Sequence, residues 1–130
     1  MAQTPITLVQ QFLSDWHTMD VERLLEYFTD DAVYHNIPVD PHVGKDAIRA
    51  FFDGWMPNAT RLDAEVHHIL ADGPIVVTER TDEVEFPTAT VRIPIAGIFE
   101  IEDGKIARWR EYFDMAQFTS QLGEPSRSEA

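Results

Sequence analysis

The segment Val76-Val77-Thr78-Glu79-Arg80-Thr81-Asp82-Glu83-Val84-Glu85-Phe86 decides the fold class, because polar and less polar residues alternate along it. The even-numbered positions carry Val, Thr, Arg, Asp, Val and Phe, whereas Glu, Thr, Glu and Glu follow Val77 at the odd-numbered positions. Side chains two apart in a β-strand point to the same face of the sheet. The segment is therefore predicted to form a strand whose less polar face carries Arg80 and Asp82.

A charged pair on the buried face of a strand is unusual. Burying charge costs free energy unless the charges are paired, and a buried pair is often less stabilising than hydrophobic residues would be. A second alternating segment near the C-terminus has the same character, and its less polar face carries Ala107, Trp109, Glu111 and Phe113. If the two strands share a sheet, we expect Arg80, Asp82 and Glu111 to meet inside one hydrophobic cavity.

The rest of the chain predicts helices first and strands afterwards. Apolar residues recur at helical spacing from Pro5 to about His17, and further helices are expected at 20–28 and 45–55. A short strand at 32–37 and a turn-rich loop at 38–44 lie between them. Strands are expected at 61–71, 75–86, 90–101 and 105–113, with Asp103-Gly104 forming a hairpin turn. This order predicts an α+β domain in which one curved, mainly antiparallel sheet wraps round the helices and leaves an internal apolar pocket.

Composition limits the possible functions. A length of 130 residues suits one domain, which we place at 1–123, followed by a mobile tail at 124–130. The net charge of −13 disfavours binding to nucleic acids and to anionic membranes. The absence of cysteine excludes disulfides and thiolate chemistry. Because the N-terminus lacks the pattern of a secretory signal and no apolar run reaches spanning length, we expect a cytoplasmic protein.

Three segments resemble the limonene-1,2-epoxide hydrolase family, which belongs to the nuclear-transport-factor-2-like and SnoaL-like cone folds. They are Tyr34-His35-Asn36-Ile37-Pro38, Thr78-Glu79-Arg80-Thr81-Asp82 and the segment from Gly104 to Asp114. The resemblance implies a cone-shaped homodimer that hydrolyses epoxides without a cofactor or metal.

The same resemblance implies a role for each matching residue. Tyr34, Asn36 and Glu111 would hold a water molecule, Asp82 would protonate the epoxide oxygen, and Arg80 would bridge the two acids. The chain departs from the family at Glu111, where the family has aspartate. A carboxylate displaced by about 1 Å can lower a rate about a hundredfold where the geometry is tight.

The chemistry itself requires such a pair of acids. Opening an epoxide with water needs one acid that starts protonated and another that starts ionised, and burial together with a shared guanidinium can separate two carboxyl pKa values. Strand alternation predicts an apolar wall that suits a small lipophilic epoxide, either cyclic or aryl-substituted. The candidate wall residues are Val84, Ile93, Ile95, Trp109 and Phe113.

Other interpretations stay open from the sequence alone. Arg80 and Asp82 could form an ordinary structural ion pair. A ketosteroid-isomerase-like or SnoaL-like isomerase or cyclase would need a carboxylate near the end of the early strand, where only Asp40 in the following loop is available. A non-catalytic carrier of lipophilic ligands is the third possibility. A metal site is disfavoured, because His67 and His68 are adjacent in a strand and point to opposite faces.

Overall fold

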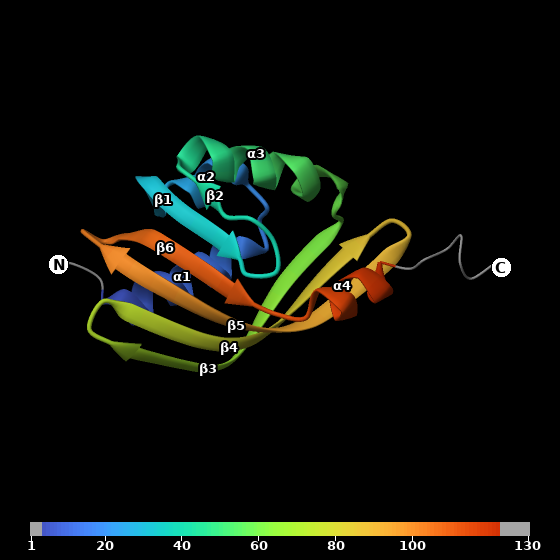
Figure 1. Cartoon of the computed structure of the whole chain (residues 1–130). Coiled ribbons are helices and arrows are strands. Elements are labelled where there is room, and N and C mark those ends of the chain that lie inside the picture. Colours follow the sequence, from blue (N-terminus) through green and yellow to red (C-terminus); the bar gives the residue numbers. More distant parts are fainter. Residues whose placement is uncertain (1–3, 123–130) are drawn as a thin grey trace.

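The computed structural model describes residues 4–122, so the tail expected at 124–130 lies outside the described residues. Helices and strands follow the order predicted from the sequence, with helices before the long strands (Figure 1). The elements are α1 (Pro5–Trp16), α2 (Val21–Leu25), β1 (Phe28–Asn36), β2 (His42–Val43), α3 (Lys45–Trp55), a 3₁₀ turn (Met56–Asn58), β3 (Arg61–Asp72), β4 (Ile75–Phe86), β5 (Ala89–Glu102), β6 (Lys105–Tyr112) and α4 (Met115–Gln121).

All six described strands belong to one sheet, in the order β2-β1-β6-β5-β4-β3. Strands β1 and β6 are parallel, and every other neighbouring pair is antiparallel. The sheet bends strongly along its length, with α2 and α3 beside β1 and β2 and with α4 against β5 (Figure 1). The predicted α+β fold with one curved sheet is thus confirmed.

Strand register brings the polar residues of four strands to one part of the concave face. Gly97 on β5 pairs with Thr78 on β4 and with Glu111 on β6, and Glu111 in turn pairs with Asn36 on β1. Arg80 lies two residues from Thr78 on the same face. Because these pairs follow directly from the ladder, the sheet itself assembles the polar cluster.

Local sequence explains where α1 begins and which face it buries. The side chain of Thr4 accepts a hydrogen bond from the amide of Thr7, and Pro5 occupies the first turn, where its missing N–H is not needed. Helical spacing places one apolar stripe against the sheet, formed by Val9, Phe12, Leu13 and Trp16. None of the helices in the described part of the chain is long and apolar enough to cross a membrane.

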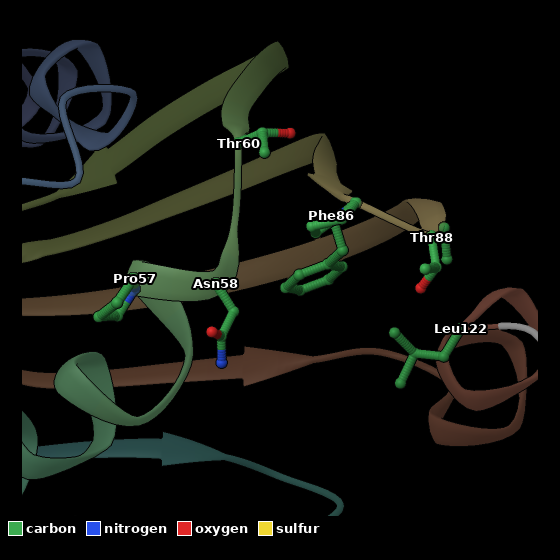
Figure 2. A pocket seen from close by; sticks show the side chains of 8 residues that line it. Pro57, Asn58, Thr60, Phe86, Thr88 and Leu122 are labelled. Atoms are coloured by element: carbon green, nitrogen blue, oxygen red, sulfur yellow. The ribbon is translucent and has the colours of Figure 1, made fainter.

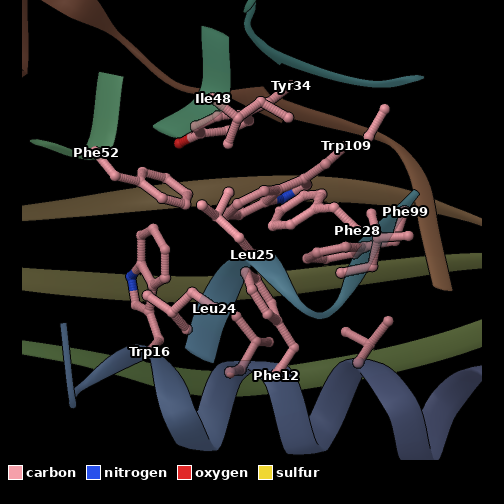
Figure 3. Packing of buried hydrophobic residues seen from close by; sticks show 14 of the residues in the cluster. Phe12, Trp16, Leu24, Leu25, Phe28, Tyr34, Ile48, Phe52, Phe99 and Trp109 are labelled. Carbon is pink, nitrogen blue, oxygen red and sulfur yellow. The ribbon is translucent and has the colours of Figure 1, made fainter. Parts of the chain in front are cut away.

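Trp109 of β6 lies at the centre of the aromatic core. Its ring stacks on Phe99 at 5.2 Å and on Tyr34 at 4.3 Å between centroids, and it meets Phe12 and Trp16 edge-on (Figure 3). Such aromatic pairs stabilise a core beyond the area that they bury. The core therefore fixes the strand that carries Glu111 two residues further on.

The structure differs from the sequence analysis in its short elements. The second helix ends at Leu25, residues 26–27 form a turn, and Phe28, which was expected to end the helix, begins β1. The loop expected at 38–44 contains β2, which pairs with β1 through His42 and Val43. His42 of β2 has a half-buried ring, which stacks on Phe51 at 4.3 Å. Helix α4 was not expected at all.

Candidate active site

The charged cluster faces a cavity of about 370 Å³ between the concave face of the sheet and the helices. That volume lies at the lower end of the range for small-molecule sites. Most of its lining is apolar, and the polar lining residues are Tyr34, Asn36, Asp82 and Glu111. The apolar part of the lining consists of Trp16, Val39, Phe51, Trp55, Leu62, Val84, Phe86, Ile93, Ile95, Phe113, Met115 and Phe118.

A second hollow lies on the outside of the molecule, where the 3₁₀ turn faces the β4–β5 turn (Figure 2). It is an open groove, and its lining includes Phe86, whose ring also lines the inner cavity. The other lining residues are Pro57, Asn58, Thr60, Pro87, Thr88, Ala89 and Leu122. Because none of them is ionisable, this groove has no group for acid–base chemistry.

Arg80 is fully buried, and all five of its N–H groups have acceptors. Its Nε and Nη2 donate to the two oxygens of Asp82 at 3.2 and 3.0 Å. Its Nη1 and Nη2 donate to the two oxygens of Glu111 at 2.9 and 2.5 Å, and Nη1 also donates to Thr78 Oγ1 at 3.2 Å. One planar guanidinium thus orients both carboxyl groups through paired hydrogen bonds.

Glu111 receives one more donor than Asp82. The indole Nε1 of Trp109 donates to Glu111 Oε2 at 2.7 Å, in addition to the bonds from Arg80. Asp82 accepts only from Arg80 among the described residues. Since hydrogen bonds to a carboxylate favour its ionised form, the Trp109 N–H favours the ionised form of Glu111.

Burial acts against ionisation in this cavity. Desolvation raises the pKa of Glu111 above the usual value, and the negative charge of Asp82 adds to the effect, while Arg80 and Trp109 oppose it. Burial alone would lower the pKa of Arg80, yet Glu111 and Asp82 raise it above the ordinary value, so the guanidinium stays charged.

Gly97 makes room for this cluster. A Cβ atom at this position would overlap Glu111 Oε2 and would lie 2.6 Å from Arg80 Nη1 and 3.0 Å from Thr78 Oγ1. The backbone of β5 therefore approaches the charges as closely as only glycine allows. The sequence analysis missed Gly97 and Thr78, although a glycine inside an alternating strand is a recognised signal of close approach.

Tyr34 and Asn36 enter the cavity from β1. They are two apart on the strand, and their side chains lie within hydrogen-bonding reach of each other. Asn36 is the direct neighbour of Glu111 across the parallel β1–β6 pair. Burial raises the pKa of the Tyr34 phenol above its ordinary value, so it acts as a neutral hydroxyl. The five residues expected to be catalytic thus lie close together, and all of them except Arg80 line the cavity.

The residues expected to form the apolar wall lie as follows. Val84, Ile93, Ile95 and Phe113 line the cavity, whereas Trp109 does not. Trp109 is fully buried in the aromatic core, and its indole N–H donates a hydrogen bond to Glu111 from there. Helix α4 supplies two wall residues that the sequence analysis missed, Met115 and Phe118.

Comparison with known proteins shows the family of this chain. Residues 9–109 match the model of the SnoaL-like domain. The epoxide hydrolase EphG of Mycobacterium tuberculosis is 34% identical over 112 residues, which make up 82% of this chain and 71% of EphG.

Solved structures show the same fold. An LEH-like epoxide hydrolase from M. tuberculosis has a TM-score of 0.80 at 30% identity, covering 91% of this chain and 88% of that one. A putative SnoaL-like polyketide cyclase from Shewanella denitrificans has a TM-score of 0.83 at 17% identity, covering 91% and 96% respectively. At that identity the second likeness concerns the fold alone. The chain belongs to the SnoaL-like family and is a homologue of a protein named as an epoxide hydrolase.

Proposed function

We propose that this protein is an epoxide hydrolase that adds water to a small lipophilic epoxide, cyclic or aryl-substituted, and releases a vicinal diol. The observation that carries the proposal is the Arg80 guanidinium, which holds Asp82 and Glu111 together in an otherwise apolar cavity. Two acids held on one cation beside a lipophilic space fit a reaction that needs both a proton donor and a proton acceptor. The 34% identity to EphG supports the same reaction.

The charge balance requires one proton on the pair. One guanidinium and two carboxylates carry a net charge of −1, and a single retained proton makes the buried cluster neutral. Burial raises the pKa of Glu111, but the Trp109 N–H, which has no counterpart at Asp82, opposes this rise, and on that ground we assign the proton to Asp82. Asp82 then acts as the general acid and Glu111 as the general base.

The reaction proceeds in one step in this proposal. Glu111, Tyr34 and Asn36 orient a water molecule, and Glu111 removes a proton from it as its oxygen attacks an epoxide carbon. The C–O bond of the epoxide breaks while Asp82 delivers its proton to the departing oxygen. Glu111 ends protonated and Asp82 ionised, and transfer of one proton between them restores the starting state. Each positioned proton transfer contributes about 10²- to 10⁴-fold to the rate.

The isomerase or cyclase alternative is not favoured. It needed Asp40 to turn inward and act as a base, but Asp40 is exposed and does not line the cavity. The non-catalytic carrier differs from the hydrolase by a single measurable property, which is diol formation.

Cyclohexene oxide and styrene oxide are suitable test substrates. The wild-type protein should convert them to diols, and Asp82→Asn and Glu111→Gln should each lower kcat/KM by at least about a hundredfold. Circular dichroism and unfolding curves check that the variants fold. If the wild-type protein binds these epoxides without forming a diol, the carrier function is correct and the proposal is wrong.

A further inference from the structure

One residue that lines the cavity has a buried indole nitrogen without a hydrogen-bond partner among the described residues. Within residues 4–122, two buried side-chain nitrogens have no hydrogen-bond partner, Trp16 Nε1 and His42 Nε2. Only Trp16 lines the cavity, and its side chain is 3% exposed. A buried donor without an acceptor costs free energy, so this N–H is an unused binding group.

The indole of Trp16 cannot turn to find an acceptor within the protein. Aromatic rings pack around it at centroid distances of 5.4 to 6.1 Å, and they belong to Phe12, Phe52, Trp55 and Trp109. Figure 3 shows its nitrogen at the same edge of the aromatic cluster as the Tyr34 hydroxyl, and both residues line the cavity. The packing therefore fixes the direction of the N–H relative to the catalytic groups.

Water is a poor permanent partner for this donor. A buried water needs two to four polar neighbours. The polar lining residues are Tyr34, Asn36, Asp82 and Glu111, and none of the rings packed around Trp16 belongs to them. An oxygen acceptor on the bound substrate would form this hydrogen bond without requiring a buried water that has too few polar neighbours.

We propose that Trp16 Nε1–H is a specificity-determining donor that binds an oxygen acceptor, such as a ketone oxygen, carried by the substrate at a distance from its epoxide. The ring centroids of Trp16 and Trp109 are 5.4 Å apart, and Trp109 in turn donates to Glu111, so one aromatic ring separates Trp16 from the charged cluster. This separation suits an acceptor placed across a six-membered ring from the epoxide. The inference rests on the proposed function, because it assigns part of the substrate of that reaction.

Two substrates of equal shape test the inference. 4-Acetyl-1,2-epoxycyclohexane carries a ketone oxygen where 4-isopropenyl-1,2-epoxycyclohexane carries a methylene group. Trp16→Phe keeps an aromatic ring and removes the donor, so it should lower the ratio of kcat/KM for the ketone over the hydrocarbon about tenfold, as expected for one neutral hydrogen bond. Trp55→Phe makes the same change in the same cavity and should leave the ratio at its wild-type value. An unchanged ratio in Trp16→Phe, or an equal fall in both variants, would overturn the inference.

A spectroscopic test is independent of activity and of variant folding. The chain has 3 tryptophans, and their indole N–H signals can be assigned by NMR. Binding of the acetyl diol should move the Trp16 signal downfield, and the isopropenyl diol should not. An acetyl diol that binds without this shift would contradict the inference. Absence of hydrolysis of both epoxides would refute the proposed function, and the NMR result would still decide the role of Trp16.

Discussion

Gly97 shows how closely the residues of the site are packed. The charged side chains of Arg80 and Glu111 occupy the space that a Cβ atom at this position would need. Gly97→Ala should therefore push Glu111 away from the guanidinium. We expect kcat/KM to fall at least about a hundredfold and the free energy of unfolding to fall by about 1–3 kcal/mol.

Gly54 in α3 provides the matched control for that substitution. A Cβ atom there would meet nothing within 4 Å, and alanine is the better helix former. Gly54→Ala should keep its activity and gain up to about 1 kcal/mol in unfolding free energy. Steady-state kinetics and urea unfolding of the two variants make the comparison. Full activity of Gly97→Ala would contradict the close approach described for β5.

The pH dependence of activity reports the state of Glu111. Burial raises the pKa of this carboxyl above its usual value of 4.5, and the general base must be ionised to act. Activity should therefore be lost as pH falls through a pKa higher than 4.5, with kcat/KM dropping about tenfold per pH unit below it. A pH–rate profile measured with cyclohexene oxide provides the value. A kcat/KM that stays constant down to pH 4.5 would show that Glu111 is not the base.

Strand alternation identified Arg80, Asp82 and Glu111 because its period of two determines the face of every side chain. It placed Trp109 on the same face, but this ring does not line the cavity. Alternation cannot tell a residue that lines a cavity from one that other side chains cover. The unsatisfied Trp16 N–H likewise depends on where neighbouring rings lie, which sequence spacing does not show.

At the scale of elements, one side chain in the last turn of α4 bonds this helix to β5. The amide group of Gln121 donates to the carbonyl of Arg92 at 2.8 Å and accepts from the amide of Arg92 at 2.7 Å. These bonds hold the helix against β5, so that Met115 and Phe118 close one side of the cavity. Gln121 is therefore a positioning residue for the apolar wall.

Gln121→Ala should loosen α4 without touching the charged cluster. Each lost hydrogen bond is worth about 1 kcal/mol, so we expect KM for styrene oxide to rise several-fold with a smaller effect on kcat. Hydrogen exchange should become faster at the Arg92 amide and throughout α4. Ser120→Ala removes only a bond within the helix and should match the wild type. Unchanged exchange in Gln121→Ala would show that the helix is held by other contacts.

The four long strands were predicted well because each alternates over many residues and Asp103-Gly104 forms the last turn. Both turn residues have positive φ, 51° and 76°, as a tight hairpin turn requires. Short elements were harder to predict. Helix α4 has few apolar residues, and its clearest signal is the N-cap Asp114, which accepts from Ala116 and Gln117. Strand β2 has only two residues and is defined by its pairing with β1, which the local sequence does not show.

At the scale of the whole molecule, the convex face of the sheet carries an apolar stripe that no described element covers. Leu70 pairs with Val77, and Val77 pairs with Ile98 on the next strand. Leu70 is 69% exposed and Val77 is 40% exposed. We propose that a second copy of the chain covers this stripe, because exposed apolar patches rimmed by polar residues mark interfaces.

Leu70→Glu combined with Val77→Glu should convert a homodimer into a monomer that still folds, as measured by light scattering after size-exclusion chromatography. Val43→Glu changes a valine that is 66% exposed at the other edge of the sheet and should leave the dimer intact. A wild-type protein that is monomeric at micromolar concentration would contradict the expectation.

The account depends on direct attack of water on the epoxide by means of Asp82, Glu111 and Arg80. A single turnover in ¹⁸O-labelled water, with the protein in excess over cyclohexene oxide, tests this most directly. The diol should carry one ¹⁸O atom from the first turnover, and peptides containing Asp82 or Glu111 should remain unlabelled. An unlabelled diol together with ¹⁸O in one of these carboxyl groups would reveal a covalent ester intermediate and would contradict the one-step mechanism.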